Sequence, residues 1–409
     1  LTLTHHSVIK RYQMKHTQLF TLLVTLFTIS ITHASSSQFF DALDGQFDAS
    51  QYLSENAYGF LPVPVIITDP AVDGGLGMIG LFFHESDDEK EERLKAMRST
   101  ENASRHLMPP SVSALIGVYT GNDSYFAGGG HMGFFNQGKI RYMGGGGYGN
   151  VNLDFYGAGN IEFNRPISLN TSASAVMQTL KFKIANTGFY VGPTHRYIKA
   201  EIKPTNVGDL ISGLPPVWED KLTELFTNEV TSSGAGFAFE YDSRNNFFSP
   251  ETGLKYELNY LWFDEKIGSD VDYQLTELTA LHYFRLAKKW RTAFRVEVNY
   301  ADTAEILPPY AIPSVSLRGI PSARYQGNST AVTELELIYE LNFRWSINAF
   351  AGIGKASNSF SDLNDSESLV SKGAGFRYLV ARRYGFNMGV DIAKGPEDTV
   401  FYIQAGSAW

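Results

Sequence analysis

The sequence predicts an all-β fold, a transmembrane antiparallel β-barrel of about 16 strands, from three observations. Long segments alternate apolar and polar residues with a period of two, which is the period of a β-strand. The connections between these segments alternate between short and long, as in barrels whose two ends face different compartments. The amino-terminal region has the features of an export signal, and no later apolar run is long enough to cross a membrane as a helix.

The amino-terminal region predicts export. Met14 is the expected start, and Lys15 precedes an apolar run over 19–31 that ends in small residues near Ala34, the order of parts in a secretory signal peptide. The expected domain organisation is an upstream segment and signal peptide over 1–34, a short periplasmic arm over 35–58, and an outer-membrane barrel over 59–409 of a Gram-negative bacterium.

The composition is that of a folded chain. Hydrophobic residues make up 43% of the 409 residues, aromatic residues 14% and charged residues 19%, which argues against intrinsic disorder. The absence of cysteine excludes disulfides, thiolate metal sites and thiol nucleophiles. The formal net charge of -9 provides no basic surface for nucleic acid, so no nucleic-acid partner is expected.

The alternation is clearest in three segments. Residues 290–300 place Trp290 on one face and Arg291 on the other, and 254–262 and 331–343 repeat the pattern. Strands of ten or more residues with an apolar face suit a tilted strand in a bilayer, whereas soluble sandwiches use strands nearer ~5–6 residues. The predicted strands are 61–67, 74–84, 111–120, 124–135, 139–157, 173–186, 188–200, 231–243, 253–265, 271–285, 290–302, 330–343, 345–356, 370–381, 384–394 and 399–409.

The predicted connections give the barrel an orientation. Tight turns are expected at 136–138, 186–188, 288–289, 343–344 and 382–383, and long loops at 158–172, 201–230, 303–329 and 357–368. Because tight turns face the periplasm in such barrels, both termini are expected there. The acidic connection 85–110 breaks the rule, and we expect either a solvated helix or flap, or an acidic loop that binds a partner. A further helical insertion is expected at 217–228.

Three segments carry a resemblance to a known family. Residues 317–327 read LRGIPSARYQG, residues 241–253 read YDSRNNFFSPETG, and the closing run covers 384–409. They resemble an inward-folded loop motif, V-R-G-F/Y, a D-x-R-D-N…P-x-x-G hairpin and the last strands of the bacterial surface antigen family of outer-membrane barrels, the group that includes BamA and TamA. Arg318 and Gly319 match the centre of the loop motif.

The resemblance implies a function in assembly and translocation. We expect the barrel to assist insertion or translocation of protein or lipid, and the alternative is a passive outer-membrane channel or structural surface antigen. Residues 35–58 are too few for the periplasmic POTRA domains of the family's assembly factors, so a separate periplasmic protein is an expected partner, together with outer-membrane lipid. No enzymatic activity, cofactor or metal is expected.

Charged residues inside the predicted lumen form the candidate site. A buried guanidinium requires carboxylates, because an unpaired buried charge is costly. In the family the loop arginine pairs with an acid on the strand that here covers 348–356, and that position is Gly352, so we expect Asp391 to pair with Arg318 and lock the loop. The alternative is an Arg318 hydrated in an open channel. The residues expected to form this lock are Arg318, Gly319, Asp391, Asp242, Arg244, Glu334, Glu336 and Arg377, with Glu340 also facing the lumen.

The first and last predicted strands are expected to form an openable seam. Pro62 and Pro64 lack the N–H groups of a fully bonded strand. Phe401 and Trp409 share one face of the closing strand, which ends the chain on an aromatic residue.

Other motifs are weak. Histidines at 84, 131, 195 and 282 lie in separate predicted strands without the spacing of metal ligands. The glycine runs at 128–130 and 144–147 lack the helix and lysine of a phosphate-binding loop, so we expect them to serve strand curvature or close packing.

Overall fold

The computed structural model describes residues 39–41, 43–55, 60–84, 111–158, 161–205, 229–246, 248–382 and 385–409. The predicted signal peptide over 1–34, the acidic connection at 85–110 and the helical insertion at 217–228 lie outside these residues.

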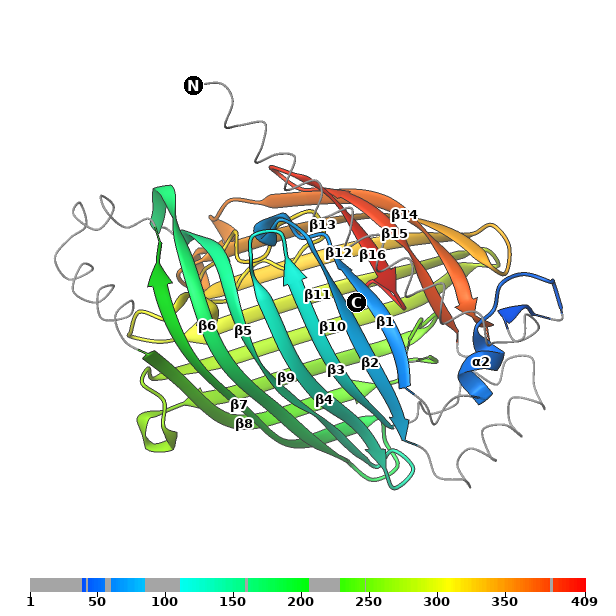
Figure 1. The fold of residues 1–409 in the computed structure, drawn as a ribbon, viewed down its shortest axis with the longest axis horizontal. Coiled ribbons are helices and arrows are strands. Elements are labelled where there is room, and N and C mark those ends of the chain that lie inside the picture. The colour runs from blue at the N-terminus through cyan, green and yellow to red at the C-terminus, as the bar shows by residue number, and fades with distance from the viewer. Residues whose placement is uncertain are drawn as a thin grey trace, which may run out of the picture.

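Sixteen strands form one antiparallel sheet in which each strand pairs with its neighbours in the chain, and the sheet curves into a nearly closed barrel (Figure 1). The all-β class and the expected strand number are confirmed. The strands are β1 Phe60–Ile67, β2 Gly75–His84, β3 Ser111–Thr120, β4 Tyr125–Phe135, β5 Ile140–Ala158, β6 Ile161–Lys183, β7 Phe189–Pro204, β8 Glu229–Asp242, β9 Gly253–Phe263, β10 Tyr273–Ala287, β11 Trp290–Asp302, β12 Ser329–Glu340, β13 Trp345–Ser357, β14 Leu369–Ala381, β15 Phe386–Lys394 and β16 Thr399–Ala405.

The period of two separates an apolar outer face from a polar inner face. On β12, Leu335 and Leu337 are 52% and 37% exposed, whereas the alternating Glu334 and Glu336 are 1% and 4% exposed. This is the reverse of a soluble protein, whose apolar side chains lie inside. The distribution is that of a barrel with a lipid-facing exterior and a polar interior.

One end of the barrel carries tight turns and aromatic pairs. Tight turns join β4 to β5, β6 to β7, β10 to β11 and β12 to β13 at this end, which is therefore the periplasmic end. Trp290 and Tyr339 lie there with ring centroids 4.8 Å apart, as do Trp345 and Tyr378. Aromatic rings of this kind mark the level of a membrane interface.

Several strand boundaries differ from the sequence prediction, and two of them affect the lumen. Residues 161–172 are the first half of β6 and pair with β5, although a loop was expected over 158–172. Ile167 and Leu169 of this segment are buried, and their packing against distant strands favours the strand over a loop. At the other end of the chain, β16 stops at Ala405 and does not continue to Trp409.

β1 and β16 are the two edges of the sheet, and no pairing joins them in the part of the chain that the structure describes. All eight residues of β1 pair with β2. Proline cannot donate in a ladder, so Pro62 and Pro64 occupy positions whose missing N–H groups lie toward the free edge. The prolines thus leave the β1–β2 ladder intact and remove two donors from the open side.

The helical elements are short. Helix α2, Ser50–Glu55, belongs to the amino-terminal arm outside the barrel (Figure 1). Turns of 3-10 helix occur at Pro70–Val72 (η2), Glu265–Ile267 (η6), Pro309–Ala311 (η7) and Ser361–Asn364 (η8). Within the described ranges, no helix has the length and apolar character needed to span a membrane.

Candidate functional site

The connection between β11 and β12, residues 303–328, folds back into the lumen, as the sequence predicts. The loop is braced by its own hydrogen bonds: the Val315 N–H donates to the Tyr325 carbonyl (2.9 Å), and the Gln326 side-chain amide donates to the Pro309 carbonyl (2.8 Å). These hydrogen bonds give the loop a folded structure of its own inside the barrel.

Apolar side chains of this loop pack against the inner wall in the external half of the lumen. Leu307 and Ile312 join one buried cluster with strand residues that include Ile167 and Leu261. A second buried cluster contains Val315, Leu317, Ile320, Val332 and Leu369. Burial of these side chains contributes about 25 cal/mol per Å² of apolar surface removed from water, which favours the inward position of the loop.

Arg318 lies at the inner end of the loop and contacts three carboxylates. Its Nη1 is 2.7 Å from Asp391 Oδ2, its Nε donates to Glu334 Oε1 at 2.7 Å, and its Nη2 is 2.7 Å from Glu336 Oε2. The guanidinium carbon lies 3.4 Å from the centre of the Phe350 ring. The expected contact between Arg318 and Asp391 is present, and the side chain is 8% exposed, so Arg318 is not a hydrated group in an open channel.

Two further arginines balance the charge around Arg318. Arg377 donates to both oxygens of Asp391, at 2.6 and 2.8 Å, and Arg295 donates to Glu334 Oε2 at 3.2 Å. We call Arg295, Arg318, Glu334, Glu336, Arg377 and Asp391 the lumen cluster. Three cations face three anions in it, which is what makes so many buried charges tolerable.

Two cavities lie near the lumen cluster. A cavity of about 40 Å³ lies between Trp409, Glu336 and Arg377. This volume holds only a few water molecules. A wider polar cavity of about 290 Å³, lined by Asn246 and Arg285 among others, lies nearer the periplasmic end.

Trp409 lies inside the barrel, which corrects the expectation that it belongs to the closing strand. Gly406 has a φ of +85° and turns the chain away from β16. The Trp409 Nε1–H then donates to Glu334 Oε2 at 3.0 Å, and its ring lies 5.7 Å from the Arg318 guanidinium. These contacts explain the inward position, because an indole N–H in lipid would have no acceptor.

Two glycines allow the loop to approach the wall. Gly319 has a φ of +90°, donates its N–H to the Tyr402 hydroxyl at 2.8 Å, and would place a Cβ 2.7 Å from the Gly395 nitrogen. A Cβ at Gly352 would lie 2.7 Å from Leu317 Cδ2. A side chain at position 352 would require Leu317 to shift, and the carboxylate comes from β15 instead.

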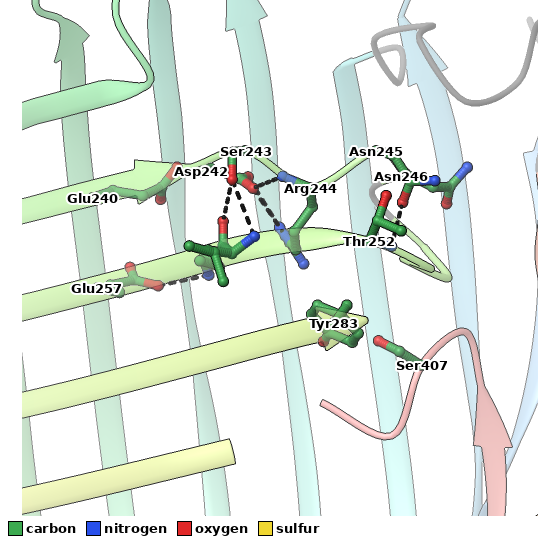
Figure 2. Close-up of polar contacts among 12 residues, drawn as sticks. Glu240, Asp242, Ser243, Arg244, Asn245, Asn246, Thr252, Glu257, Tyr283 and Ser407 are labelled. Carbon is green, nitrogen blue, oxygen red and sulfur yellow. Dashed lines mark hydrogen bonds and ion pairs between the residues drawn. The ribbon is translucent and has the colours of Figure 1, made fainter. Parts of the chain in front are cut away.

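Asp242 and Arg244 form a separate pair, although the sequence analysis placed them in the lock. Arg244 donates to Asp242 through Nε (3.0 Å) and Nη2 (3.1 Å) at the start of the β8–β9 hairpin (Figure 2). All ion pairs of Arg318 are with the carboxylates of the lumen cluster. The side chains at 242 and 244 were correctly predicted to face inward, but they lie nearer the periplasmic end.

Residues 322–324 of the inward loop contact the hairpins at both edges of the sheet. The Ser322 N–H donates to Asp69 Oδ2 (3.2 Å) in the turn after β1. Arg324 pairs with Glu397 (Nε to Oε2, 3.1 Å) in the turn before β16 and stacks on Tyr156 at 3.9 Å. The hydrogen bond from Arg324 lowers the pKa of Glu397. One loop thus bridges β1 and β16 on the external side.

The amino-terminal arm carries a second ionic site, which the sequence analysis missed. Arg344, in the β12–β13 turn, donates to Asp41 (2.7 Å), Asp44 (2.8 Å) and Asp48 (2.5 Å), and it is 4% exposed. Arg382 donates to Asp41 at 2.6 Å. The three acids spaced three and four residues apart were the available signal, but their partners lie about 300 residues away in the chain.

The pKa values of two carboxyls in the arm, Asp41 and Asp44, are lowered by their surroundings. Burial opposes ionisation of Asp41, but the hydrogen bonds from Arg382 and from the Leu43 N–H, together with the charges of Arg382 and Arg344, outweigh it and lower the pKa of this carboxyl. The hydrogen bond from Arg344 is the main cause that lowers the pKa of Asp44. Both groups are therefore ionised and attached at neutral pH.

Comparison with known proteins identifies similar barrels. Residues 147–409 match the Omp85 superfamily domain. BamA from Haemophilus ducreyi lacking POTRA domains 1-3 has a TM-score of 0.52 at 14% identity, covering 84% of this chain and 69% of that one. CdiB from Acinetobacter baumannii (0.52, 11%, covering 85% and 59%) and CdiB from Escherichia coli (0.54, 10%, covering 84% and 62%) are also similar, so this chain spans about three fifths of the CdiB chains. No curated protein matches.

Proposed function

The chain belongs to the Omp85 superfamily of outer-membrane barrels, and from that premise we propose that it assists the insertion or translocation of protein or lipid at the outer membrane. The proposed working part is the seam between β1 and β16. A separate periplasmic protein would deliver the cargo.

The observation that carries this proposal is the pair of unpaired sheet edges beside a lumen that holds a folded loop. A passive pore needs an open interior and gains nothing from an open sheet edge. Here the loop at 303–328 lies inside the external half of the lumen, where two buried apolar clusters hold it. An unpaired edge, by contrast, is a template on which another strand can form hydrogen bonds.

The prolines of β1 make this template incomplete. A strand added to the free edge of β1 finds carbonyl acceptors at Pro62 and Pro64 but no N–H donors. Each missing backbone hydrogen bond costs the added strand about 0.5–1.5 kcal/mol. An edge of this kind holds a passing strand weakly enough to release it.

A reversible cross-link tests the proposal. Ile66 on β1 and Phe401 on β16 both face outward near the external end of their strands, and the chain has no native cysteine. We expect Ile66→Cys/Phe401→Cys, joined by a cleavable bifunctional reagent, to lose the ability to accelerate folding of a small unfolded barrel into proteoliposomes. Cleaving the reagent should restore it. The matched control is Leu335→Cys/Ala351→Cys, which joins two strands already paired.

Unchanged activity with the seam joined would contradict the proposal. Planar-bilayer recording supplies an independent measure, in which a large and steady conductance would favour the alternative of a passive channel. Pull-down from outer membranes, with and without residues 85–110, tests the proposed periplasmic partner.

A further inference from the structure

Three polar side chains form a hydrogen-bonded row on the outside of the barrel. His84 Nε2 lies 2.8 Å from Ser113 Oγ, and the same hydroxyl lies 2.9 Å from His131 Nδ1. The residues come from β2, β3 and β4, and the two imidazole rings are 5.6 Å apart. The histidines that are scattered in the sequence are therefore brought together here.

The row faces lipid. Ser113 lies on the same face of β3 as Leu115, which is 60% exposed, and His131 lies on the same face of β4 as Phe135, which is 48% exposed. In the pairing of β3 with β4, Ser113 lies directly opposite His131, so both side chains leave the sheet on the same side. Polar groups that face a bilayer need partners, because the hydrocarbon supplies none.

The row lies at the level of the periplasmic headgroups. His84 ends β2, Ser113 is the third residue of β3, and His131 is four residues from the end of β4, all at the periplasmic end. The rings of Phe135 and Tyr142 lie 6.5 and 6.2 Å from His131, among the interfacial aromatic residues of that end. At this level the lipid presents phosphodiester and glycerol groups.

The geometry fixes what the row offers to a ligand. A serine hydroxyl has one proton, so it donates to one imidazole and accepts from the other. With both rings neutral, one of the two outer nitrogens, His84 Nδ1 or His131 Nε2, must then carry a proton. Among the described residues neither outer nitrogen has a hydrogen-bond partner. The row therefore keeps one N–H donor directed away from its own contacts.

From this arrangement we propose that the imidazoles of His84 and His131, held in place by Ser113, bind the phosphate of a phospholipid in the periplasmic leaflet. A phosphodiester only accepts hydrogen bonds and carries a negative charge, so it suits an imidazole donor. The strands β2, β3 and β4 contain no Asp, Glu, Lys or Arg, so none of their side chains repels the phosphate or pairs with the imidazoles in its place.

Native mass spectrometry of the whole protein in detergent, titrated with phosphatidylglycerol, tests the site. Loss of a hydrogen bond to a charged group corresponds to about a ten-fold weaker affinity, and we expect at least this from His84→Phe/His131→Phe, which removes both outer nitrogens. The matched control is His282→Phe, an outward histidine on β10 whose contacts are with the rings of Tyr256, Phe284 and Phe294. Its affinity should equal that of the wild type.

Two further ligands test whether the site recognises a phosphate group that is part of a lipid. Diacylglycerol with the same acyl chains should bind at least ten-fold more weakly, and inorganic phosphate should not displace the lipid. The proposal is wrong if diacylglycerol binds equally well, if free phosphate competes, or if His84→Phe/His131→Phe retains wild-type affinity. Heat-modifiable gel migration verifies that each variant is folded, and His84→Ala/His131→Ala tests the row where the double phenylalanine variant fails to fold.

Discussion

Replacing Arg318 by methionine should destabilise the barrel by the cost of one unpaired buried carboxylate. Asp391 would keep both hydrogen bonds from Arg377, at 2.6 and 2.8 Å. Glu334 would keep Arg295 at 3.2 Å. Only Glu336, which is 4% exposed, would lose its ion pair. Removing one partner of a buried pair costs about 3–5 kcal/mol, and this is the expected loss in the free energy of unfolding.

Urea titration in lipid vesicles, followed by tryptophan fluorescence and gel migration, measures the loss. Glu336→Gln added to Arg318→Met should recover at least half of it, because the amide removes the unpaired charge. Arg324→Met, which breaks an exposed pair with Glu397, should cost less than about 1 kcal/mol. A loss below about 1 kcal/mol for Arg318→Met, or no recovery in the double variant, would refute the charge balance of the lumen cluster.

Three other changes probe the loop, the arm and the chain end. Gly319→Ala should destabilise more than Gly268→Ala in urea titration, because both have positive φ but only position 319 lacks room for a Cβ. Asp41 and Asp44 have lowered pKa values, so their contribution to arm docking is complete above the ordinary pKa of 3.8 and is lost as the pH falls below it. Protease cleavage of the arm should rise over that range, and not in an Asp41→Asn/Asp44→Asn variant, which is cleaved at every pH. Trp409→Phe removes the hydrogen bond to the lumen cluster and should cost about 1.5–3 kcal/mol in the same titration, whereas no change would contradict the inward position of the indole.

The features that depend on local pattern were predictable from the sequence. Alternation gave strand number, strand parity and the inward direction of Glu334 and Asp391, because a strand turns successive side chains to opposite faces. The pairing of Arg318 with Asp391 followed from parity together with the loop motif.

The features that depend on distant contacts were not. Residues 161–172 form a strand because Ile167 and Leu169 pack into a cluster supplied by distant strands and the inward loop. Trp409 leaves the lipid face because Glu334 offers an acceptor 75 residues away. The arm docks because its three acids form ion pairs with Arg344. No local period encodes any of these partners, so only the assembled barrel reveals them.

The positions of the loop contacts link the lumen cluster to the seam. Arg318 is anchored on Asp391 of β15, and Gly319 donates to Tyr402 of β16, so the inner part of the loop is attached to the closing edge. Ser322, further along the loop, donates to Asp69 in the hairpin that contains β1. A movement that separates β1 from β16 must therefore break either the contacts on Tyr402 and Glu397 or the contact on Asp69. Because the buried charges of Arg318 and Asp391 are far costlier to separate than the exposed contact at Asp69, the first strand should move away while the loop stays with the last strands.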